Sequence, residues 1–308
     1  MTQKNHNLSK KTRNYFKLIT VFNSIGKDIN DIIIKNIMKR ANPGMKIFDM
    51  HVHIFPDKIA DKAVAAIGKF YENFNMECDG RLETAIRVMD EAGITCCCAH
   101  AVATTAHQVA SINEFVLNAW HAYPDRIIPF AALHPDLDRP AETVESLIKA
   151  GFRGVKLHPE IQGFKIDAPE VLRMIEPFAG RLPLLVHAGD YRYDNSSPAR
   201  LKNLLKAFPN LTLICAHLGG WTVWEKAAGE LPGENVYVDT SSSLFALKPE
   251  QAVRFIHAYG VDHVLYGTDY PMWNPVGELA RFNALELTDE EREKILWTNH
   301  LKLFGAKN

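Results

Sequence analysis

The octapeptide FDMHVHIF, residues Phe48–Phe55, places His51 and His53 at the end of an apolar run. In a β-strand, side chains two residues apart point to the same face. Both imidazoles would therefore face one side where the strand ends, an arrangement in which two histidines can bind one metal ion. An H-x-H pair also occurs by chance. The rest of the chain has to decide between a metal-binding pair and two polar residues at a strand end.

The composition is that of an ordinary globular protein. The chain has 308 residues, 47% hydrophobic and 23% charged, with a formal net charge of −1. No global field attracts nucleic acid or an anionic membrane, and no apolar run approaches the roughly 18 residues of a membrane helix. The five cysteines are odd in number and three are adjacent, unlike a disulfide framework. We expect a cytoplasmic protein with a small-molecule substrate and no nucleic-acid or membrane partner; a homodimer is common on general grounds.

Residues 1–44 differ in composition from the rest of the chain. They hold nine Lys or Arg against two Asp and end in Pro43-Gly44, before Met45 opens the first apolar run. Three interpretations are open: a peripheral basic arm or helix, an over-extended start with Met45 as the true start, and an organelle transit peptide. None affects the chemistry. We divide the chain into an N-terminal extension, 1–44, and one domain, 45–308.

From Met45 onward, short apolar runs alternate with longer amphipathic stretches. The runs predict strands at 46–53, 93–102, 127–133, 152–158, 182–187, 211–216, 235–240 and 263–268. The stretches predict helices at 80–92, 108–123, 140–150, 169–180, 197–208, 221–229, 248–259 and 288–304. The last of these begins at Thr288 with Glu291 three residues on, a capping-box pattern.

Eight strands alternating with helices over about 260 residues match the size of a (β/α)8 barrel. Continuous apolar runs suit parallel strands that are buried on both faces. An open doubly wound sheet is the competing fold, but no strand is followed by a GxGxxG or GxxxxGK[ST] phosphate loop. We therefore predict an α/β protein with a single (β/α)8 TIM-type barrel.

Side chains that carry chemistry gather at the ends of the predicted strands. In such barrels the loops after the strands form the active face. Scattered core or surface histidines would not cluster in this way, so the pattern favours the metal-binding interpretation of the H-x-H pair. The strand-end residues are His51, His53, Lys156, His158, His187, His217 and Asp269.

The ordered set of strand-end motifs resembles the metal-dependent amidohydrolase superfamily. Within it, the sequence is similar to the amidohydrolase-related branch that includes aminocarboxymuconate-semialdehyde-decarboxylase-like enzymes. The resemblance covers nearly all of 45–308 and implies an enzyme that uses a divalent metal, usually one zinc ion. The matching segments are FDMHVHIF, GFRGVKLHPE, LPLLVHAGD, ICAHLGG, LYGTDYP and EKILWTNHLKLFG.

The resemblance also implies the roles of five residues. The metal ligands would be His51, His53, His187 and Asp269, and such nitrogen and oxygen ligands suit Zn²⁺. Asp269 would in addition take a proton from metal-activated water. His217 would polarise the substrate or carry a proton.

Three further residues are candidates for contact with the substrate. Lys156 is either carboxylated and bridges two metal ions, or stays cationic and meets an anionic substrate group. His158 shares its face of the predicted strand. Arg192 lies between aromatics in the loop 190–194, where it could bind a substrate carboxylate through two hydrogen bonds or be an ordinary exposed residue.

Two reactions fit these residues. We expect first a hydrolase that opens a small, carboxylate-bearing amide, lactone or ester through metal-activated water. The alternative is a lyase, a non-oxidative metal-dependent decarboxylase of an aromatic or unsaturated carboxylic acid. The same ligands serve both reactions. A non-catalytic binding protein would be expected to have lost a ligand, and none of the four is missing.

Overall fold

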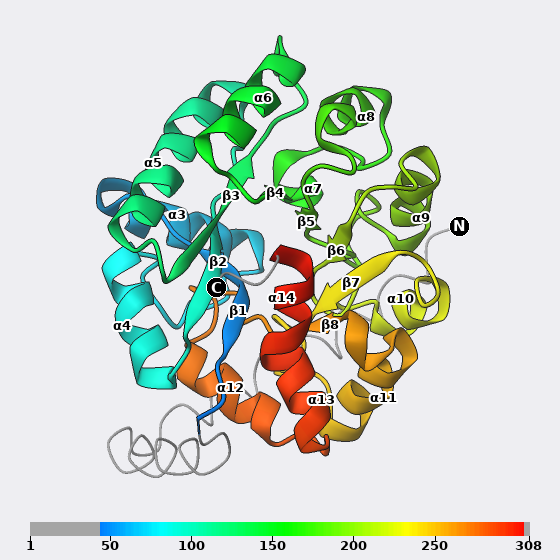
Figure 1. Ribbon diagram of the computed structural model, residues 1–308. Coiled ribbons are helices and arrows are strands. Elements are labelled where there is room, and N and C mark those ends of the chain that lie inside the picture. The colour runs from blue at the N-terminus through cyan, green and yellow to red at the C-terminus, as the bar shows by residue number, and fades with distance from the viewer. Residues whose placement is uncertain (1–43, 305–308) are drawn as a thin grey trace. The chain divides into compact units, whose positions relative to one another are not determined.

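The computed structural model describes residues 44–304 (Figure 1). The predicted N-terminal extension therefore lies, except for Gly44, outside the described residues, and its three interpretations stay predictions. No helix among residues 44–304 combines the length and apolarity needed to cross a lipid bilayer.

Eight parallel strands form one sheet in which each strand pairs with the next along the chain. Backbone hydrogen bonds then join the last strand to the first: the Met50 amide donates to the Tyr266 carbonyl and the His53 amide to the Tyr270 carbonyl, both at 2.8 Å. The predicted barrel is confirmed, and each predicted strand is present in shorter form. The strands are β1 (Phe48–His53), β2 (Cys96–His100), β3 (Ile127–Ala132), β4 (Gly154–Leu157), β5 (Leu184–Val186), β6 (Leu213–Cys215), β7 (Val236–Asp239) and β8 (Val264–Leu265).

Helices lie between the strands and surround the barrel (Figure 1). Those that match predicted segments are α4 (Leu82–Ala92), α5 (Val109–Ala122), α6 (Pro140–Ala150), α8 (Pro169–Ile175), α9 (Pro198–Ala207), α10 (Trp224–Glu230) and α11 (Pro249–Tyr259). Among residues 44–304, three α-helices were not predicted: α3 (Asp57–Phe70), α7 (Pro159–Gln162) and α12 (Pro275–Asn283). Of these, α3 and α7 follow the ends of β1 and β4, so they belong to the face where the strand-end residues lie.

The predicted C-terminal helix is present in three segments, α13 (Asp289–Glu293), a π-helical turn (Lys294–Thr298) and α14 (Asn299–Phe304). Its capping box is confirmed, because the Thr288 amide donates to Glu291 Oε2 at 2.8 Å and the Glu291 amide to Thr288 Oγ1 at 3.3 Å.

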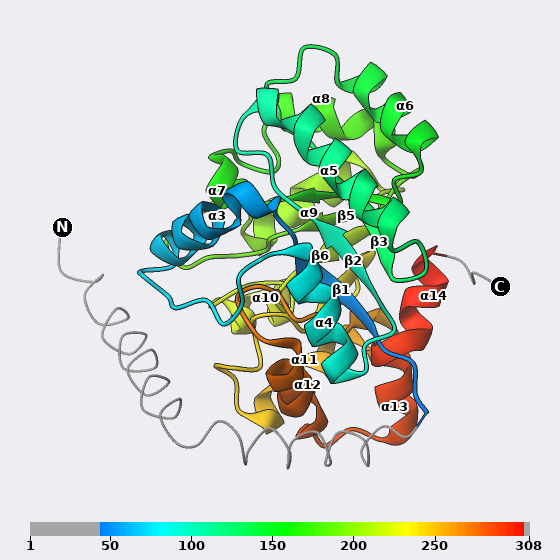
Figure 2. The same cartoon turned by 90° about the vertical axis from the view of Figure 1, so that its left-hand side faces the viewer.

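The barrel is covered at the amino ends of its strands by α14. The rings of His300 and Phe304 stack on Phe48, at the start of β1, with centroid distances of 4.5 and 5.6 Å. Figure 2 shows α14 and α3 at opposite ends of the barrel. The open face is therefore the one that carries the strand-end residues.

The barrel interior holds an apolar cluster to which most of the strands contribute, including Met50, Cys98, Phe130, Leu185 and Ile214. Burial raises the pKa of the Cys98 thiol well above its usual range. The adjacent cysteines thus behave as small apolar core residues.

One core contact depends on a missing side chain. Phe130 on β3 is fully buried and pairs in register with Gly154, the first residue of β4. A Cβ atom at Gly154 would overlap the Phe130 ring. Glycine is therefore required here for space, because a well-packed core cannot absorb an added methyl group without shifting its neighbours.

We predict that Gly154→Ala lowers the free energy of unfolding by about 1–3 kcal/mol through overpacking. Urea unfolding followed by circular dichroism measures the change. The matched control is Gly229→Ala in α10, where an added Cβ meets no atom within 4 Å. That variant should be unchanged or more stable by up to about 1 kcal/mol. Equal stabilities for both variants would contradict the packing argument.

Candidate active site

The end of β1 brings the two opening histidines together. His51 Nε2 lies 3.2 Å from His53 Nε2. The register with β2 shifts between Asp49 and Val52, which marks a bulge next to the site. His51 is buried and His53 only partly, and both line one cavity. The sequence-based expectation that both imidazoles face the same side agrees with this geometry.

Asp269, after β8, lies against the same pair. Its Oδ1 is 3.4 Å from His51 Nε2 and 3.6 Å from His53 Nε2, while its backbone amide donates to the His51 carbonyl at 2.9 Å. Its φ of +63° is in the left-handed region, which is unusual for a residue other than glycine and is typical of functional sites. Its other oxygen, Oδ2, accepts a hydrogen bond from Ser242 Oγ, which in turn accepts from the Trp273 indole at 2.9 Å.

Asp239, the last residue of β7, fixes the orientation of His51. Its Oδ2 lies 2.9 Å from His51 Nδ1, and its Oδ1 accepts from the backbone amides of His217 and Ser241 at 3.0 and 3.1 Å. A carboxylate accepts hydrogen bonds, so the proton of His51 sits on Nδ1 and the lone pair on Nε2 faces His53 and Asp269.

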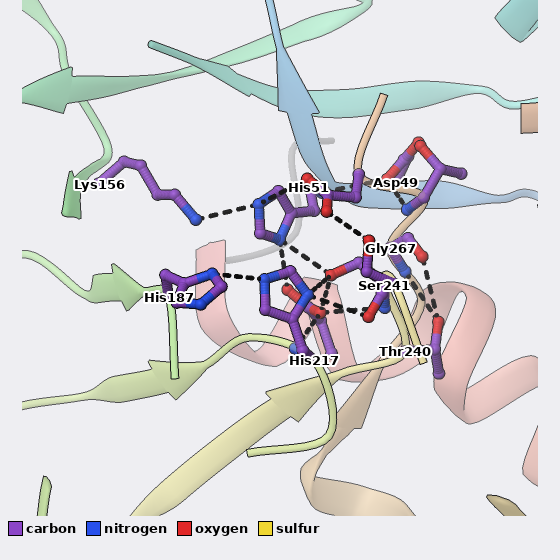
Figure 3. Close-up of polar contacts among 12 residues, drawn as sticks. Asp49, His51, Lys156, His187, His217, Thr240, Ser241 and Gly267 are labelled. Carbon is purple, nitrogen blue, oxygen red and sulfur yellow. Dashed lines mark hydrogen bonds and ion pairs between the residues drawn. The ribbon is translucent and has the colours of Figure 1, made fainter. Parts of the chain in front are cut away.

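A second chain of hydrogen bonds orients the rings of His217 and His187 (Figure 3). His217 Nδ1 lies 3.0 Å from the carbonyl oxygen of Ser241, so this nitrogen carries the proton. His217 Nε2 then accepts from His187 Nδ1 at 2.9 Å. The remaining nitrogen, His187 Nε2, is buried and has no hydrogen-bond partner among residues 44–304. Like Asp269, His217 has a positive φ, +62°.

The four expected metal ligands line the same cavity but are not equally close. His51, His53 and Asp269 meet at one point, whereas His187 Nε2 faces Glu160 Oε2 at 3.9 Å. His187, His158 and Glu160 form a second group of buried ligand atoms within 4.8 Å of one another. His158 stacks on His187 with centroids 4.0 Å apart.

The donor set fits a divalent cation. Burial lowers the pKa of His51, His53 and His187 well below the usual value, so each imidazole is neutral and can offer a lone pair. The two acceptor atoms His51 Nε2 and Asp269 Oδ1 lie 3.4 Å apart. A cation would relieve the repulsion between such acceptors, and imidazole nitrogen with carboxylate oxygen is a set that divalent transition metals accept.

Lys156 on β4 is fully buried beneath this group. Its Nζ donates to His51 Nε2 at 3.0 Å, and desolvation lowers the pKa of the amine to about 8. Lys156 would have to release this hydrogen bond for a metal ion to bind His51 Nε2. Both interpretations of Lys156, carboxylated bridge and cationic substrate contact, remain open.

His158 and Arg192 have different surroundings. His158 lines the cavity and its Nε2 lies 3.0 Å from the hydroxyl of Tyr71. Arg192 pairs with both carboxylate oxygens of Asp190 and donates to the Phe70 carbonyl at 2.6 Å. The aromatic neighbours predicted for Arg192 are present, but in this arrangement its guanidinium holds the loop. Its role as a substrate clamp stays a prediction.

Several residues of the site were not predicted from the sequence. Asp239 ends a predicted strand, a position that could have drawn attention to it. Asp49 has no such signal: it is buried, accepts from Thr268 Oγ1 at 2.6 Å, and desolvation raises its pKa to about 7. Tyr71 follows α3, which was itself missed. His100 stacks edge-on against His53 at 4.3 Å, and its ring nitrogens have no hydrogen-bond partner among the described residues.

The strand-end histidines lie within a segment that matches a known protein family. The sequence profile of the Amidohydrolase family matches residues 48–306. The chain belongs to this family. The match spans all eight strands of the barrel, so the resemblance drawn from the strand-end motifs is confirmed.

Proteins similar to this chain include both decarboxylases and a probable hydrolase. A gamma-resorcylate decarboxylase from Rhizobium radiobacter is 23% identical over 81% of this chain and 94% of that protein. Among solved structures, a 5-carboxyvanillate decarboxylase from Novosphingobium aromaticivorans with manganese matches with a TM-score of 0.68 at 19% identity, covering 85% of this chain and 97% of that one. A probable 2-pyrone-4,6-dicarboxylic acid hydrolase from Acinetobacter baumannii matches with a TM-score of 0.63 at 18% identity, covering 85% and 100%.

We predict that Asp239→Asn weakens the binding of a divalent metal by about 10–100-fold, because an amide no longer enforces the Nδ1-protonated form of His51. Competition with a chromophoric chelator, using Mn²⁺ or Zn²⁺, measures the dissociation constant. The control is Asp167→Asn, which removes a carboxylate paired with Arg200 outside the site. If both variants bind metal as tightly as the parent, Asp239 does not position the ligand.

Proposed function

We propose that this protein is a divalent-metal-dependent decarboxylase of an aromatic carboxylic acid. The observation that carries the proposal is the curated relative, a gamma-resorcylate decarboxylase, which aligns over 94% of its own length. Solved decarboxylases of dihydroxybenzoate and 5-carboxyvanillate share the fold. These relatives support the alternative that the sequence left open better than the hydrolase expected first, although a hydrolase also shares the fold.

The proposed metal ligands are His51, His53, His187 and Asp269. A bound divalent ion would orient the substrate and draw electron density from its oxygens. Zn²⁺ is the ion suggested by the family resemblance, whereas manganese is present in the 5-carboxyvanillate decarboxylase structure. The site's neutral imidazoles and carboxylate accept either ion.

The chain's own residues account for the remaining steps. We assign the substrate carboxylate to the side of the cavity lined by His158, close to Lys156, whose Nζ contacts His51. A buried amine there would attract an anion strongly. In decarboxylation the bond between ring carbon and carboxylate breaks, CO₂ leaves, and the ring carbon keeps the electron pair and takes a proton. In the metal-free site burial raises the pKa of Asp269 to about 6. We assign to this carboxyl group the delivery of that proton to the ring carbon.

We assign His217 to the proton transfer because its ring is held by hydrogen bonds on both sides. It bonds to His187 on one side and to Ser241 on the other, and burial lowers its pKa to about 4. A neutral imidazole held between two partners can accept and pass a proton without a large change in geometry.

The reaction class can be decided with three compounds and the metal-loaded protein. We expect 2,6-dihydroxybenzoate or 5-carboxyvanillate to release CO₂ with one equivalent of the phenolic product. We expect no ring opening of 2-pyrone-4,6-dicarboxylate. CO₂ is followed by a coupled enzymatic assay and hydrolysis by the loss of pyrone absorbance. Pyrone hydrolysis without CO₂ release from either aromatic acid would restore the hydrolase.

We predict that Asp269→Asn reduces turnover by at least about 100-fold, because the variant loses its proton donor. Circular dichroism should show an intact fold. Asp61→Asn, a change in an exposed carboxylate that pairs with Arg81, serves as the control and should keep full activity. Retained turnover in Asp269→Asn would remove this residue from the mechanism.

Metal content tests the ligand set separately. We expect about one equivalent in the purified, metal-reconstituted protein and almost none in a His51→Ala, His53→Ala double variant, measured by inductively coupled plasma mass spectrometry. Two equivalents in the parent protein would instead favour a carboxylated Lys156 that bridges two ions.

A further inference from the structure

The cavity over the site is larger than a single-ring acid requires. Its volume is about 920 Å³. Pockets that enclose drug-sized ligands span roughly 300–1,000 Å³, so this one is near the upper end of the range. The catalytic histidines and Asp269 line only its inner part. A benzoate-sized molecule placed there would leave the outer part unfilled.

The outer part of the cavity runs between α3 and α5, which lie beside each other in both views of the fold (Figures 1 and 2). Its walls there combine apolar side chains with polar ones, and most of the apolar side chains form the inner, half-buried part. The lining residues that carry the argument are Ile59, Ala63, Ala66 and Ile67 from α3 and Ile112 and Phe115 from α5.

Two features of α3 distinguish this channel from ordinary core. Ala63 and Ala66 are three residues apart and so share a helix face, where their short side chains leave width between the helices. Ile59, nearer the rim, is 42% exposed, one of the few large apolar side chains among residues 44–304 that are exposed. An apolar surface that is continuous with a catalytic site indicates a ligand-binding wall.

The charged residues of the channel are at its rim. Lys58 and Lys62, one helical turn apart on α3, and Glu114 on α5 line the cavity and are exposed, as are the polar lining residues Ser111 and Asn118 of α5. The half-buried lining residues of these two helices are all apolar, and the polar ones are all exposed to water. Such a gradient suits a molecule whose reacting head is buried and whose chain extends outward.

We infer that the substrate is an aromatic acid that carries an apolar chain, with the ring at the histidines and the chain between α3 and α5. The inference rests on the proposed decarboxylase function for the identity of the head group. The chain would be attached opposite the carboxylate, because the reacting group lies at the inner end of the cavity and the opening at the other.

Binding of product-type phenols tests the channel without turnover. Isothermal titration calorimetry of the full-length, Mn²⁺-loaded protein compares resorcinol with 5-octylresorcinol, whose chain is opposite the carbon that would carry the carboxylate. Each buried methylene tightens binding by about threefold or more, less the cost of ordering the chain. We expect 5-octylresorcinol to bind at least about 100-fold tighter, at one molecule per chain. Equal dissociation constants would overturn the inference.

A matched pair of variants locates the chain. Ala66→Trp fills the channel and should reduce the advantage of 5-octylresorcinol over resorcinol at least tenfold. Ala65→Trp places the same side chain on the adjacent residue of α3, which is exposed and does not line the cavity, and should keep the full advantage. An advantage that survives in Ala66→Trp would show that the chain binds elsewhere and would also overturn the inference.

Turnover separates this inference from the proposed function. CO₂ release is measured from 2,6-dihydroxybenzoate and from the same acid with an octyl chain at position 4. If the octyl compound binds as expected but neither acid loses CO₂, the channel stands and the assigned reaction is wrong. If CO₂ is released with no binding advantage for the chain, the reaction stands and the channel has no such ligand.

Discussion

The closure of the barrel between its first and last strands is the constraint on which the site depends. Asp49 and Thr268 are 219 residues apart in sequence, yet the Asp49 carboxylate accepts from both the amide and the hydroxyl of Thr268. The next residue, Asp269, donates its backbone amide to His51. Without this junction the carboxylate of one chain end and the imidazoles of the other would not meet. The closure of the barrel therefore brings Asp269 next to His51 and His53.

Within the closed barrel, burial does most of the electrostatic tuning. The site holds several titratable side chains in a space from which water is largely excluded, so the charged form of each group is disfavoured. His51, His53 and His187 stay neutral, Lys156 can lose its proton near pH 8, and Asp269 can keep one near pH 6. One physical cause therefore leaves the imidazoles with free lone pairs and raises the pKa of the Asp269 carboxyl group.

The elements correctly predicted from the sequence are those that a short stretch of residues identifies by itself. Buried parallel strands appear as apolar runs, and side chains at the strand ends share one face of the barrel by topology alone. The helix α3 was missed although its Ala and Lys residues favour a helix and Ile59, Ala63, Ile67 and Phe70 recur at helical spacing. Asp239 and Glu160 were missed because their functions depend on partners contributed by other strands. For Arg192 the aromatic environment was correctly expected, but its carboxylate partner is Asp190 of its own loop.

The cover that α14 forms over the amino ends of the strands has a kinetic consequence. With that end packed by His300 and Phe304 against Phe48, the cavity over the histidines opens at the other end of the barrel, past α3 and α5. A molecule that enters and leaves the cavity through this opening obstructs the next arrival. In the proposed reaction, the organic product would then compete with the substrate for the same opening.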